Sequence, residues 1–586
     1  MVFLAGLACL TACSDDGWQE AETDSGLIDL TEKGTVVPGV LRVKLESEPA
    51  ADICVASSDG STVLTGIRTL DVAGTTLRIT RMERVFPDAG KYEERTRREG
   101  LHLWYNVWYE QAETASNVAR QVAVLDGIAA AEPVYAVQTR ALQGTEEQWA
   151  AVAPRAGAWL FNDPDVGKQW YLRNPGTAAW AVEGADVGLT DEVWRQYNGD
   201  PSIVVAVVDG GIEVTHPDLA DNIWTDENGA HGWNFMNNSP VLNAYYHATH
   251  VAGLIAAVNN NGRGISSIAG GDGTPGSGVK LMSCQIMDSN GNSRLANYAA
   301  AIKYGADHGA VISQNSWGYQ SAQETAQSEK DAIDYFIKYA GCDENGNQLP
   351  GSPMKGGIVL FATNNHNSES ELDAAPADYD PVVAVAALNP DFTKASYSDY
   401  GSYIDISAPG GHFTINGGKI WSTANSDYSY LSGASMACPL VSAACALIIQ
   451  KYGVGKPGFT PERLKDILLG SATDISAYNP DYVGKLGAGI VNIERALTME
   501  VDELPAFQLL NNRIVDGLLL FKVTSELAGE GELTLYDAAG HRVYRQTLTL
   551  GAYACFTLDV SRLSAGYYSL QYACNGTTVK ENFIKY

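Results

Sequence analysis

The sequence has few positive charges and no closely spaced cysteine pairs. Its 39 Lys and Arg residues are outnumbered by 69 Asp and Glu residues, which gives a formal net charge of -30 and a pI near 4.6. This balance argues against binding to nucleic acid or to an anionic membrane surface through basic patches. None of the nine cysteines forms a CxxC pair, which disfavours a zinc site. No segment after the N-terminus is predicted to cross a membrane.

The length of 586 residues, 45% of them hydrophobic, is enough for three or four domains with a large core. The 59 glycines indicate many tight turns, as in α/β enzymes. We attribute the acidity to solubility outside the cytoplasm. Together these features predict a large exported protein.

The N-terminus reads "MVFLAGLACLTACSDDG". Its apolar run is too short to span a bilayer and ends in Leu-Thr-Ala-Cys, which resembles the bacterial lipobox. We therefore predict a lipoprotein signal segment over residues 1–13, lipidated at Cys13, and a tether over residues 14–35. The "SDD" after Cys13 resembles the surface-export signal of Bacteroidetes lipoproteins. An ordinary cleaved secretory peptide is the alternative, and the basic n-region is missing.

Residues 36–137 alternate between strand and helix patterns and predict a small α+β domain. A linker rich in Ala, Gln and Gly is predicted over residues 138–160. The aromatic stretch "LWYNVWY" (103–109) favours a buried sheet face, with a carbohydrate platform as the alternative.

The section 161–503 alternates apolar strands with helices, which predicts a parallel sheet covered on both faces. The predicted strands are 202–211, 279–288, 309–318 and 356–365, and the predicted helices include 296–308 and 323–339. Asp209, Ser316 and Asn365 each close a strand. Because sites in such sheets lie beyond the carboxyl ends of the strands, these residues are candidates for a functional site.

Beyond residue 503 the helical pattern is replaced by short alternating strands with Gly or Asp turns. Residues 504–586 are therefore predicted to form an antiparallel β-sandwich. A disulfide between Cys555 and Cys574 is left open.

Three separated segments carry a set of residues suited to nucleophilic catalysis. They are "VVAVVDGGIEVTHPDL" with Asp209, "YYHATHVAGLIAA" with His247, and "GASMACP" with Ser435. A serine nucleophile needs a base to accept its proton and a carboxylate to orient that base. The alternative for Ser435 is a small residue that allows close helix packing.

These segments, together with "HPDL", "HVAG", "NNNGRGISSIAGG" and "SAPGG", resemble the subtilases, the subtilisin-like serine peptidases, in the chain order Asp, His, Ser. The resemblance covers about residues 160–500. It implies that Asp209 orients His247, that His247 is the general base and acid, and that Ser435 is the nucleophile at a helix N-terminus. Asn365 aligns with the family's oxyanion asparagine, with the Ser435 N–H as second donor. Ser316, Trp317 and Gly318 resemble the strand that pairs with the substrate backbone.

The chain departs from the family pattern at several positions near these residues. Ala248 follows the histidine in place of glycine, and Ala434 precedes the serine in place of threonine. Asn364 replaces a glycine and is expected to tolerate left-handed φ. Gly210 replaces a Ser or Thr, and "ACPL" (437–440) replaces "ASPH". None of these changes removes a member of the triad.

The flanking regions also resemble known modules. Residues 36–137 resemble the ferredoxin-like subtilase propeptide, a folding aid and inhibitor, so the enzyme is expected to cut its own linker at 138–160. Release of the catalytic part from a lipid on Cys13 would follow; a permanently attached structural module is the alternative. Residues 504–586 resemble the sorting domains of type IX secretion, and we interpret them as a related accessory sandwich.

Two kinds of position in the sequence are candidates for metal binding. His216, His231 and His250 read better as structural residues than as ligands. The loops "DSNGNS" (288–293) and "DENGNQ" (343–348) begin like calcium loops but lack the glutamate at position twelve, which favours turn chemistry. We expect no cofactor for catalysis; structural calcium stays open, without an assigned site.

The sequence thus predicts an extracytoplasmic serine endopeptidase, lipid-anchored at the outer membrane or cell surface or released after processing. Its partners would be protein or peptide substrates and its own propeptide, with membrane contact only through Cys13. A non-catalytic adhesion protein on the same scaffold and a dedicated processing enzyme are the alternatives. The residue preferred before the scissile bond is not evident, although Ala374–Ala375 are candidates for the pocket floor.

Overall fold

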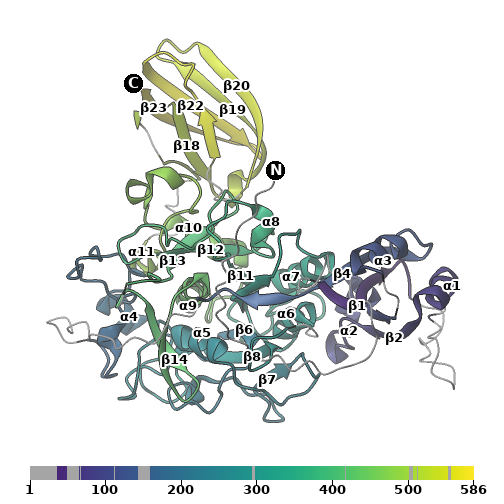
Figure 1. Ribbon diagram of the computed structural model, residues 1–586. Helices are drawn as coiled ribbons and strands as arrows, with labels where there is room; N and C mark the ends of the chain where they lie inside the picture. Colours follow the sequence, from purple (N-terminus) through teal and green to yellow (C-terminus); the bar gives the residue numbers. More distant parts are fainter. Residues whose placement is uncertain are drawn as a thin grey trace, which may run out of the picture.

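The computed structural model describes residues 36–48, 65, 67–110, 113–142, 159–293, 297–415, 417–499, 506–510, 513–515, 517–551 and 556–586. Within these ranges the chain forms an N-terminal α+β domain, a central α/β domain and a C-terminal β lobe (Figure 1). The predicted signal segment, the tether and Cys13 lie outside the described residues, as does most of the predicted linker.

The N-terminal domain is a four-stranded antiparallel sheet in the order β2-β3-β1-β4, with α1 and α3 beside it. This order and the succession βαββαβ are ferredoxin-like, as predicted. The aromatic stretch forms β3, in which Trp104, Tyr105, Val107 and Tyr109 are buried. The elements are β1 (Val36–Leu45), α1 (Arg68–Leu77), β2 (Ile79–Arg84), α2 (Glu93–Arg98), β3 (Trp104–Tyr109), α3 (Ala115–Val122) and β4 (Ile128–Tyr135).

The central domain contains a seven-stranded, wholly parallel sheet in the order β13-β12-β11-β9-β6-β8-β7. This confirms the predicted fold class. The sheet strands are β6 (Val204–Gly210), β7 (Gly232–Asn234), β8 (Lys280–Met287), β9 (Ile312–Asn315), β11 (Ile358–Ala362), β12 (Val383–Leu388) and β13 (Ile406–Pro409). The helices are α4 (Asp191–Gln196), α5 (Tyr246–Ala256), α6 (Tyr298–Asp307), α7 (Gln327–Tyr339), α8 (Glu371–Ala374), α9 (Ala434–Tyr452), α10 (Pro461–Gly470) and α11 (Ile493–Thr498).

Helices cover both faces of this sheet because its strands are apolar on both sides. Along β6, Val205 and Val207 face a core shared with α5 and α9, whereas Val204 and Val208 face a core shared with α6 and α7. The short strands of the domain are β5 (Val137–Thr139), β10 (Trp317–Tyr319), β14 (Ile420–Ala424) and β15 (Asp427–Leu431).

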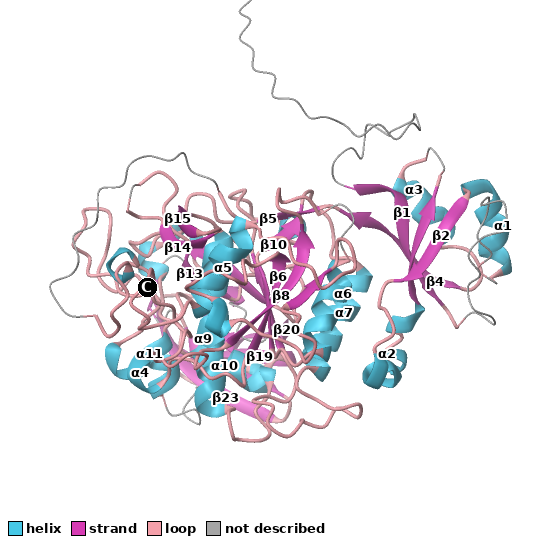
Figure 2. Cartoon of the chain, turned by 90° about the horizontal axis from the view of Figure 1, so that it is seen from below, coloured by secondary structure: helices cyan, strands magenta, loops and turns pink. Residues whose placement is uncertain are grey.

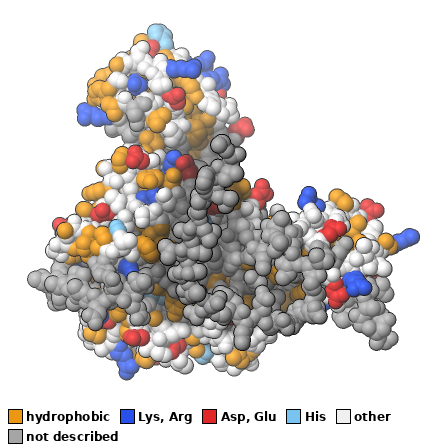
Figure 3. Space-filling model, in the orientation of Figure 1, with side chains coloured by type: hydrophobic (Ala, Val, Ile, Leu, Met, Phe, Trp, Pro, Cys, Tyr) orange, Lys and Arg blue, Asp and Glu red, His pale blue; other side chains and the backbone are white. Residues whose placement is uncertain are grey.

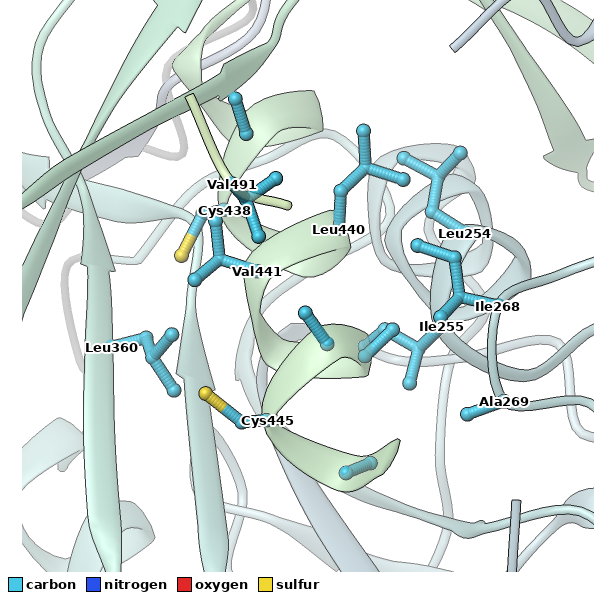
Figure 4. Close-up of a cluster of buried hydrophobic side chains, with 14 of the residues drawn as sticks. Leu254, Ile255, Ile268, Ala269, Leu360, Cys438, Leu440, Val441, Cys445 and Val491 are labelled. Carbon is cyan, nitrogen blue, oxygen red and sulfur yellow. The ribbon is translucent and has the colours of Figure 1, made fainter. Parts of the chain in front are cut away.

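Helix α9 runs through the first of these cores, and Figure 4 shows Leu440 and Val441 of α9 among Leu254, Ile255 and Leu360. Cys438 and Cys445 are buried free thiols in the same cluster, as predicted for small core residues. By length and composition α9 is apolar enough to cross a membrane, so the sequence-based exclusion of such a segment was wrong. Because 89% of its apolar window is buried, its hydrophobicity is explained by the core.

The C-terminal lobe consists of a three-stranded sheet, β16-β18-β21, packed against a five-stranded sheet, β17-β23-β22-β19-β20. One pairing, β17 with β23, is parallel, so the predicted sandwich is not wholly antiparallel. The lobe projects from the central domain, with charges of both signs on the face shown in Figure 3. Cys574 is a free cysteine there, and Cys555 lies outside the described residues. The strands are β16 (Phe507–Leu509), β17 (Arg513–Ile514), β18 (Leu518–Val523), β19 (Gly529–Asp537), β20 (Arg542–Leu550), β21 (Phe556–Asp559), β22 (Gly566–Cys574) and β23 (Thr577–Lys585).

The N-terminal domain packs its sheet beside α6 and α7 of the central domain (Figure 2). Arg42 of β1 forms a buried ion pair with Glu329 of α7, with 2.8 Å between Nη1 and Oε1. Glu132 of β4 accepts hydrogen bonds from the first two backbone N–H groups of α7, at Gln327 and Ser328. A carboxylate there complements the positive end of the helix. Buried polar and charged contacts thus accompany the apolar cluster that the two domains share.

Candidate active site

The carboxyl edge of the central sheet gathers the polar residues that the sequence placed at strand ends. Strands β6, β9 and β11 are immediate neighbours in the sheet. Asp209 lies at the end of β6, Ser316 directly follows β9, and Asn365 follows β11. Parallel strands end at the same edge, so three side chains far apart in the sequence converge there.

Asp209 and His247 form a buried hydrogen-bonded pair. His247 Nδ1 lies 3.0 Å from Asp209 Oδ1 and 2.9 Å from Oδ2, and neither side chain is exposed. Because a carboxylate only accepts hydrogen bonds, Nδ1 carries the proton and Nε2 is left as the basic nitrogen. Among the described residues His247 Nε2 has no hydrogen-bond partner. The imidazole is therefore oriented as a base.

Gly210, which replaces a Ser or Thr of the family pattern, is required by its surroundings. A Cβ at this position would lie 2.5 Å from the side chain of Tyr245. Its backbone N–H donates to Asp209 Oδ1 at 2.6 Å, so the carboxylate gains a donor despite the missing hydroxyl. Ala248 is fully buried and fits within α5.

Ser435 lies at the second position of α9, where backbone N–H groups are free of helical partners. Its Oγ donates to the carbonyl of Ser316 at 3.1 Å and makes no hydrogen bond with His247 in this structure. Pro439, four residues on, has no N–H to donate to the Ser435 carbonyl. That carbonyl instead accepts from Ser316 Oγ at 3.0 Å, which ties the helix N-terminus to the end of β9.

Asn365 reaches the same helix N-terminus from β11. Its Oδ1 accepts a hydrogen bond from the Ala434 N–H at 3.0 Å, which fixes the amide and leaves Nδ2 as the free donor. Asn364 does not have positive φ, so the left-handed conformation that it is expected to tolerate is not adopted here. Its side chain instead donates to the carbonyl of Asp373 and accepts from the Asn365 N–H, which holds the loop after β11 in place.

A strand from the chain's own N-terminal region lies across these residues. β5 pairs antiparallel with β10, with Thr139 opposite Trp317 and Gln138 opposite Gly318. The pairing continues on both sides, since Gln320 N donates to Ala136 O and Arg140 N donates to Ser316 O, each at 3.0 Å. This pairing occurs along the predicted substrate-binding strand, Ser316 to Gly318, and is a β-augmentation.

The strand carries one peptide carbonyl directly onto the N-terminus of α9. The Ser435 N–H donates to the carbonyl of Arg140 at 2.9 Å. Gly433 is needed beneath it, because a Cβ there would lie 2.4 Å from that oxygen and 2.9 Å from Ala141 Cα. Leu142 N then donates to Ser432 O at 2.7 Å. The Arg140–Ala141 peptide bond is thus held over Gly433 and Ser435.

Sequence reasoning did not identify Arg140, nor the acidic residues around its side chain. Arg140 directly follows β5 and lies near the start of the predicted linker 138–160, and that position was the available signal. The predicted pocket floor at Ala374–Ala375 adjoins the site, since Tyr319 N donates to Ala375 O. Two acidic residues lie near Arg140: Asp373, which directly precedes the predicted pocket floor, and Asp399.

The residues considered as metal ligands make structural contacts instead. His250 is fully buried, with Nε2 near the carbonyls of Ile420 and Ser429, and burial lowers its pKa to about 3. Asp288 and Asp343 accept backbone N–H groups two and four residues on, which is turn chemistry. Within the described ranges, no group of three or more His, Cys, Asp or Glu side chains is arranged to hold a metal ion.

Comparison with known families agrees with this geometry. Residues 200–489 match the family model described as the subtilase family, and residues 518–586 match a secretion system C-terminal sorting domain. Thermitase of Thermoactinomyces vulgaris is 31% identical over 246 residues, covering 42% of this chain and 74% of thermitase.

Halolysin of Haloferax mediterranei is also 31% identical, over 353 residues that cover 59% of this chain and 56% of halolysin. The chain therefore spans little more than half of that relative. Among solved structures, fervidolysin of Fervidobacterium pennivorans superposes with a TM-score of 0.55 at 19% identity, covering 96% of this chain and 78% of fervidolysin. At that identity the likeness concerns the fold alone.

Proposed function

Since the chain belongs to the subtilase family, we propose that it is an exported serine endopeptidase whose acyl-enzyme forms on Ser435. The observation that carries this proposal is the Arg140 carbonyl, which accepts a hydrogen bond from the Ser435 N–H beside a buried Asp209–His247 pair. A peptide bond held at the N-terminus of α9 is in the position that a scissile bond requires.

In the first step, Ser435 Oγ leaves the Ser316 carbonyl by rotation about its Cα–Cβ bond and gives its proton to His247 Nε2. Oγ attacks the carbonyl carbon, and the negative charge develops on the carbonyl oxygen. The Ser435 N–H, the Asn365 amide Nδ2 and the N-terminus of α9 stabilise that charge. Asp209 keeps His247 in the correct tautomer and stabilises its protonated form.

His247 then gives the proton to the leaving amine, and the C–N bond breaks. A water molecule attacks the acyl-enzyme with His247 again as base, which frees Ser435 and a new carboxyl group. Substrates would bind as a strand along Ser316, Trp317 and Gly318, as β5 does. These side chains supply the nucleophile, base and donors, so we propose catalysis without a cofactor. A structural calcium site stays a prediction without assigned ligands.

The test is labelling with a fluorophosphonate probe and cleavage of a denatured protein, with Ser435→Ala as the negative variant. We expect wild type to be labelled and active, and Ser435→Ala to lose both while keeping its circular dichroism spectrum. Asn365→Ala should retain labelling but lose about 10²–10³-fold in kcat, a magnitude established in subtilisin, a relative of this chain. An unlabelled wild type with an accessible cleft would instead support a non-catalytic binding protein.

We also propose that the enzyme cuts the linker between its N-terminal and central domains, in the predicted range 138–160. β5 and the residues after it support this, because they fill the cleft as a substrate would. The match to a secretion system C-terminal sorting domain supports a location outside the cell or at its surface. In this proposal a lipid on Cys13 would retain the N-terminal domain at the membrane after the cut.

A further inference from the structure

The side chain of Arg140 occupies a closed pocket beside the candidate nucleophile. Only 1% of the residue is exposed, and its Nη2 donates to the carbonyl of Tyr319 at 3.3 Å. Gly318 forms one wall, where a Cβ would lie 1.8 Å from Nη2. Any larger residue at Gly318 would therefore exclude a guanidinium from this position. We call the set Gly318, Tyr319, Asp373, Asp399 and Tyr403 the arginine pocket.

Two carboxylates give this pocket its charge. Burial lowers the pKa of Arg140 to about 10, and Asp399 and Asp373 oppose that effect, so the guanidinium stays charged at neutral pH. Arg140 makes no direct ion pair with either carboxylate among the described residues. Instead, the buried Nε and Nη1 donors and the acceptors Asp399 Oδ2 and Tyr403 Oη are all left without partners. Complementary unpaired groups on both sides indicate a site for a cation with several donors.

The pocket is supported by its own domain rather than by Arg140. Asp399 Oδ1 accepts hydrogen bonds from the backbone N–H groups of His366 and Ser368, at 2.9 and 3.0 Å. Asp373 Oδ2 accepts from Ser368 Oγ at 2.7 Å. The loop after β11 thus holds one oxygen of each carboxylate, and the second oxygen of Asp399 remains for a ligand.

The backbone places Arg140 in register with the reacting groups. The Ser316 carbonyl accepts both the Arg140 N–H and the Ser435 hydroxyl, so the nucleophile lies beside this residue. Of the four residues before Ala141, Val137 and Arg140 are buried whereas Gln138 and Thr139 are partly exposed. The side chains of Val137 and Arg140 are therefore the ones that the cleft encloses.

We propose that the enzyme is selective for arginine immediately before the scissile bond, and that Arg140–Ala141 is the bond it cuts in its own chain. This rests on the proposed peptidase function and names its substrate class: proteins and peptides with an accessible arginine, favoured by an aliphatic residue three positions earlier. Hydrolysis breaks the Arg140 C–Ala141 N bond and adds one water, leaving a carboxylate on Arg140 and an amine on Ala141.

The choice of arginine follows from the unpaired acceptors. An apolar side chain would leave the buried Asp399 without the positive charge that Arg140 supplies. Lysine carries the same charge but offers a single compact ammonium, whereas the planar guanidinium can reach Tyr319 O and face Asp399 at once. Lysine should therefore be accepted less well than arginine.

The experiment uses the purified full-length chain and the peptide Val-Gln-Thr-Arg joined to a fluorogenic amine, with Lys, Leu or Phe replacing Arg in matched peptides. We expect kcat/KM to be about 10²-fold or more higher for Arg than for Leu or Phe. Asp399→Asn keeps an acceptor for the two N–H groups but removes the charge; it should lose most of this preference and still react with the fluorophosphonate probe. Asp221→Asn is the charge-matched control. Asp221 is exposed and lies beside Lys280 at the start of β8, away from the carboxyl edge of the sheet where the site lies.

Gly318→Ala should depress cleavage after Arg more than cleavage of a further matched peptide with Ala in place of Arg, because the added methyl fills the guanidinium position. Mass spectrometry of the matured chain should find Ala141 at the new N-terminus. A labelled enzyme that prefers Leu or Phe, or an unchanged preference in Asp399→Asn, would overturn the selectivity. A new N-terminus elsewhere would overturn the maturation site. An unlabelled wild type would instead remove the proposed function on which both depend.

Discussion

Arg42 and Arg140 both cross from the N-terminal part of the chain into the central domain, and both are buried, yet they are received differently. Arg42 donates directly to Glu329 Oε1 at 2.8 Å and Ser328 Oγ at 2.9 Å. Among the described residues, the side chain of Arg140 makes one hydrogen bond, to a backbone carbonyl, and no ion pair with the carboxylates whose charge acts on it. One contact is a closed pair and the other is a pocket with an occupant.

The two contacts differ in which hydrogen-bond partners the carboxylate of the central domain keeps once the arginine is removed. Glu329 has Arg42 as its ion-pair partner, and its second oxygen, Oε2, is buried without a hydrogen bond among the described residues. Asp399 has two backbone N–H donors from its own domain. In a docking pair each charged group depends on the other for its partner, whereas a substrate pocket must keep its shape and charge when it is empty. The same residue type therefore serves attachment in one place and recognition in the other.

Removing the closed pair should have the largest effect. At or above pH 8, where Glu329 is ionised in the docked state, Arg42→Ala leaves its buried carboxylate without a partner, at a cost of about 3–5 kcal/mol, so the cleaved N-terminal domain should bind roughly 10²–10⁴-fold more weakly. The measurement is recovery of peptidase activity when matured protein is serially diluted. Arg81→Ala, which breaks an exposed pair with Glu83 within the N-terminal domain, should leave the dilution curve unchanged. Identical curves for Arg42→Ala and wild type would refute the distinction.

Replacing Arg140, the occupant of the arginine pocket, should have the next largest effect. It should change the rate of precursor conversion rather than the affinity between the two domains. Arg140→Leu should slow conversion of the precursor by about 10²-fold, because a buried carboxylate loses its cation. Arg140→Lys should restore part of that rate. Conversion is followed by gel electrophoresis over time. Equal rates for Leu and Arg at this position would show that the pocket does not discriminate.

The closed pair should also respond to pH. Burial raises the pKa of Glu329 to about 8 in the docked state, with Arg42 lowering it and Glu132 raising it, and burial also raises the pKa of Glu132. Docking therefore takes up protons above the ordinary glutamate range, and affinity should fall as pH rises from about 5 to 8, by up to about tenfold per pH unit for one carboxyl. The dilution assay at several pH values measures this. Glu329→Gln should make the docking affinity less dependent on pH. A docking affinity that instead falls as the pH is lowered would contradict this prediction.

The smallest effect should come from the exposed edge of the same interface. Lys338 pairs with Glu99 at 2.7 Å, but its side chain is 58% exposed. Lys338→Ala should weaken docking by no more than about 1 kcal/mol, and less at high salt, because solvent screens the pair. The same dilution assay in low and high salt checks it. If Lys338→Ala weakened docking as much as Arg42→Ala does, burial would not be what makes one ion pair contribute more than the other.

The sequence predicted the sheet and the convergence of its polar strand ends because both follow from local patterns. Buried runs such as 202–211 appear as strands, and parallel strands bring Asp209, Ser316 and Asn365 to one edge. The catalytic roles of these residues and of Ser435 stay predictions until they are measured.

The arginine pocket could not be predicted in the same way. Asp373 lies in the single-turn helix α8 and Asp399 in an irregular segment, and neither is long enough for periodicity to mark which residues face one another. Their relevance follows only from where Arg140 reaches. The role of Asn364 was not predictable for a similar reason, since it depends on side-chain hydrogen bonds to Asp373 and to the Asn365 N–H. The parallel pairing of β17 with β23 likewise depends on a long-range contact.

The short strand β5 is covalently part of the molecule whose cleft it fills. A bond delivered in this way needs no encounter between two molecules, so its cleavage is a first-order event. The half-time of precursor conversion should then be the same at nanomolar and micromolar protein. Each newly folded chain would complete its own maturation even where it is alone.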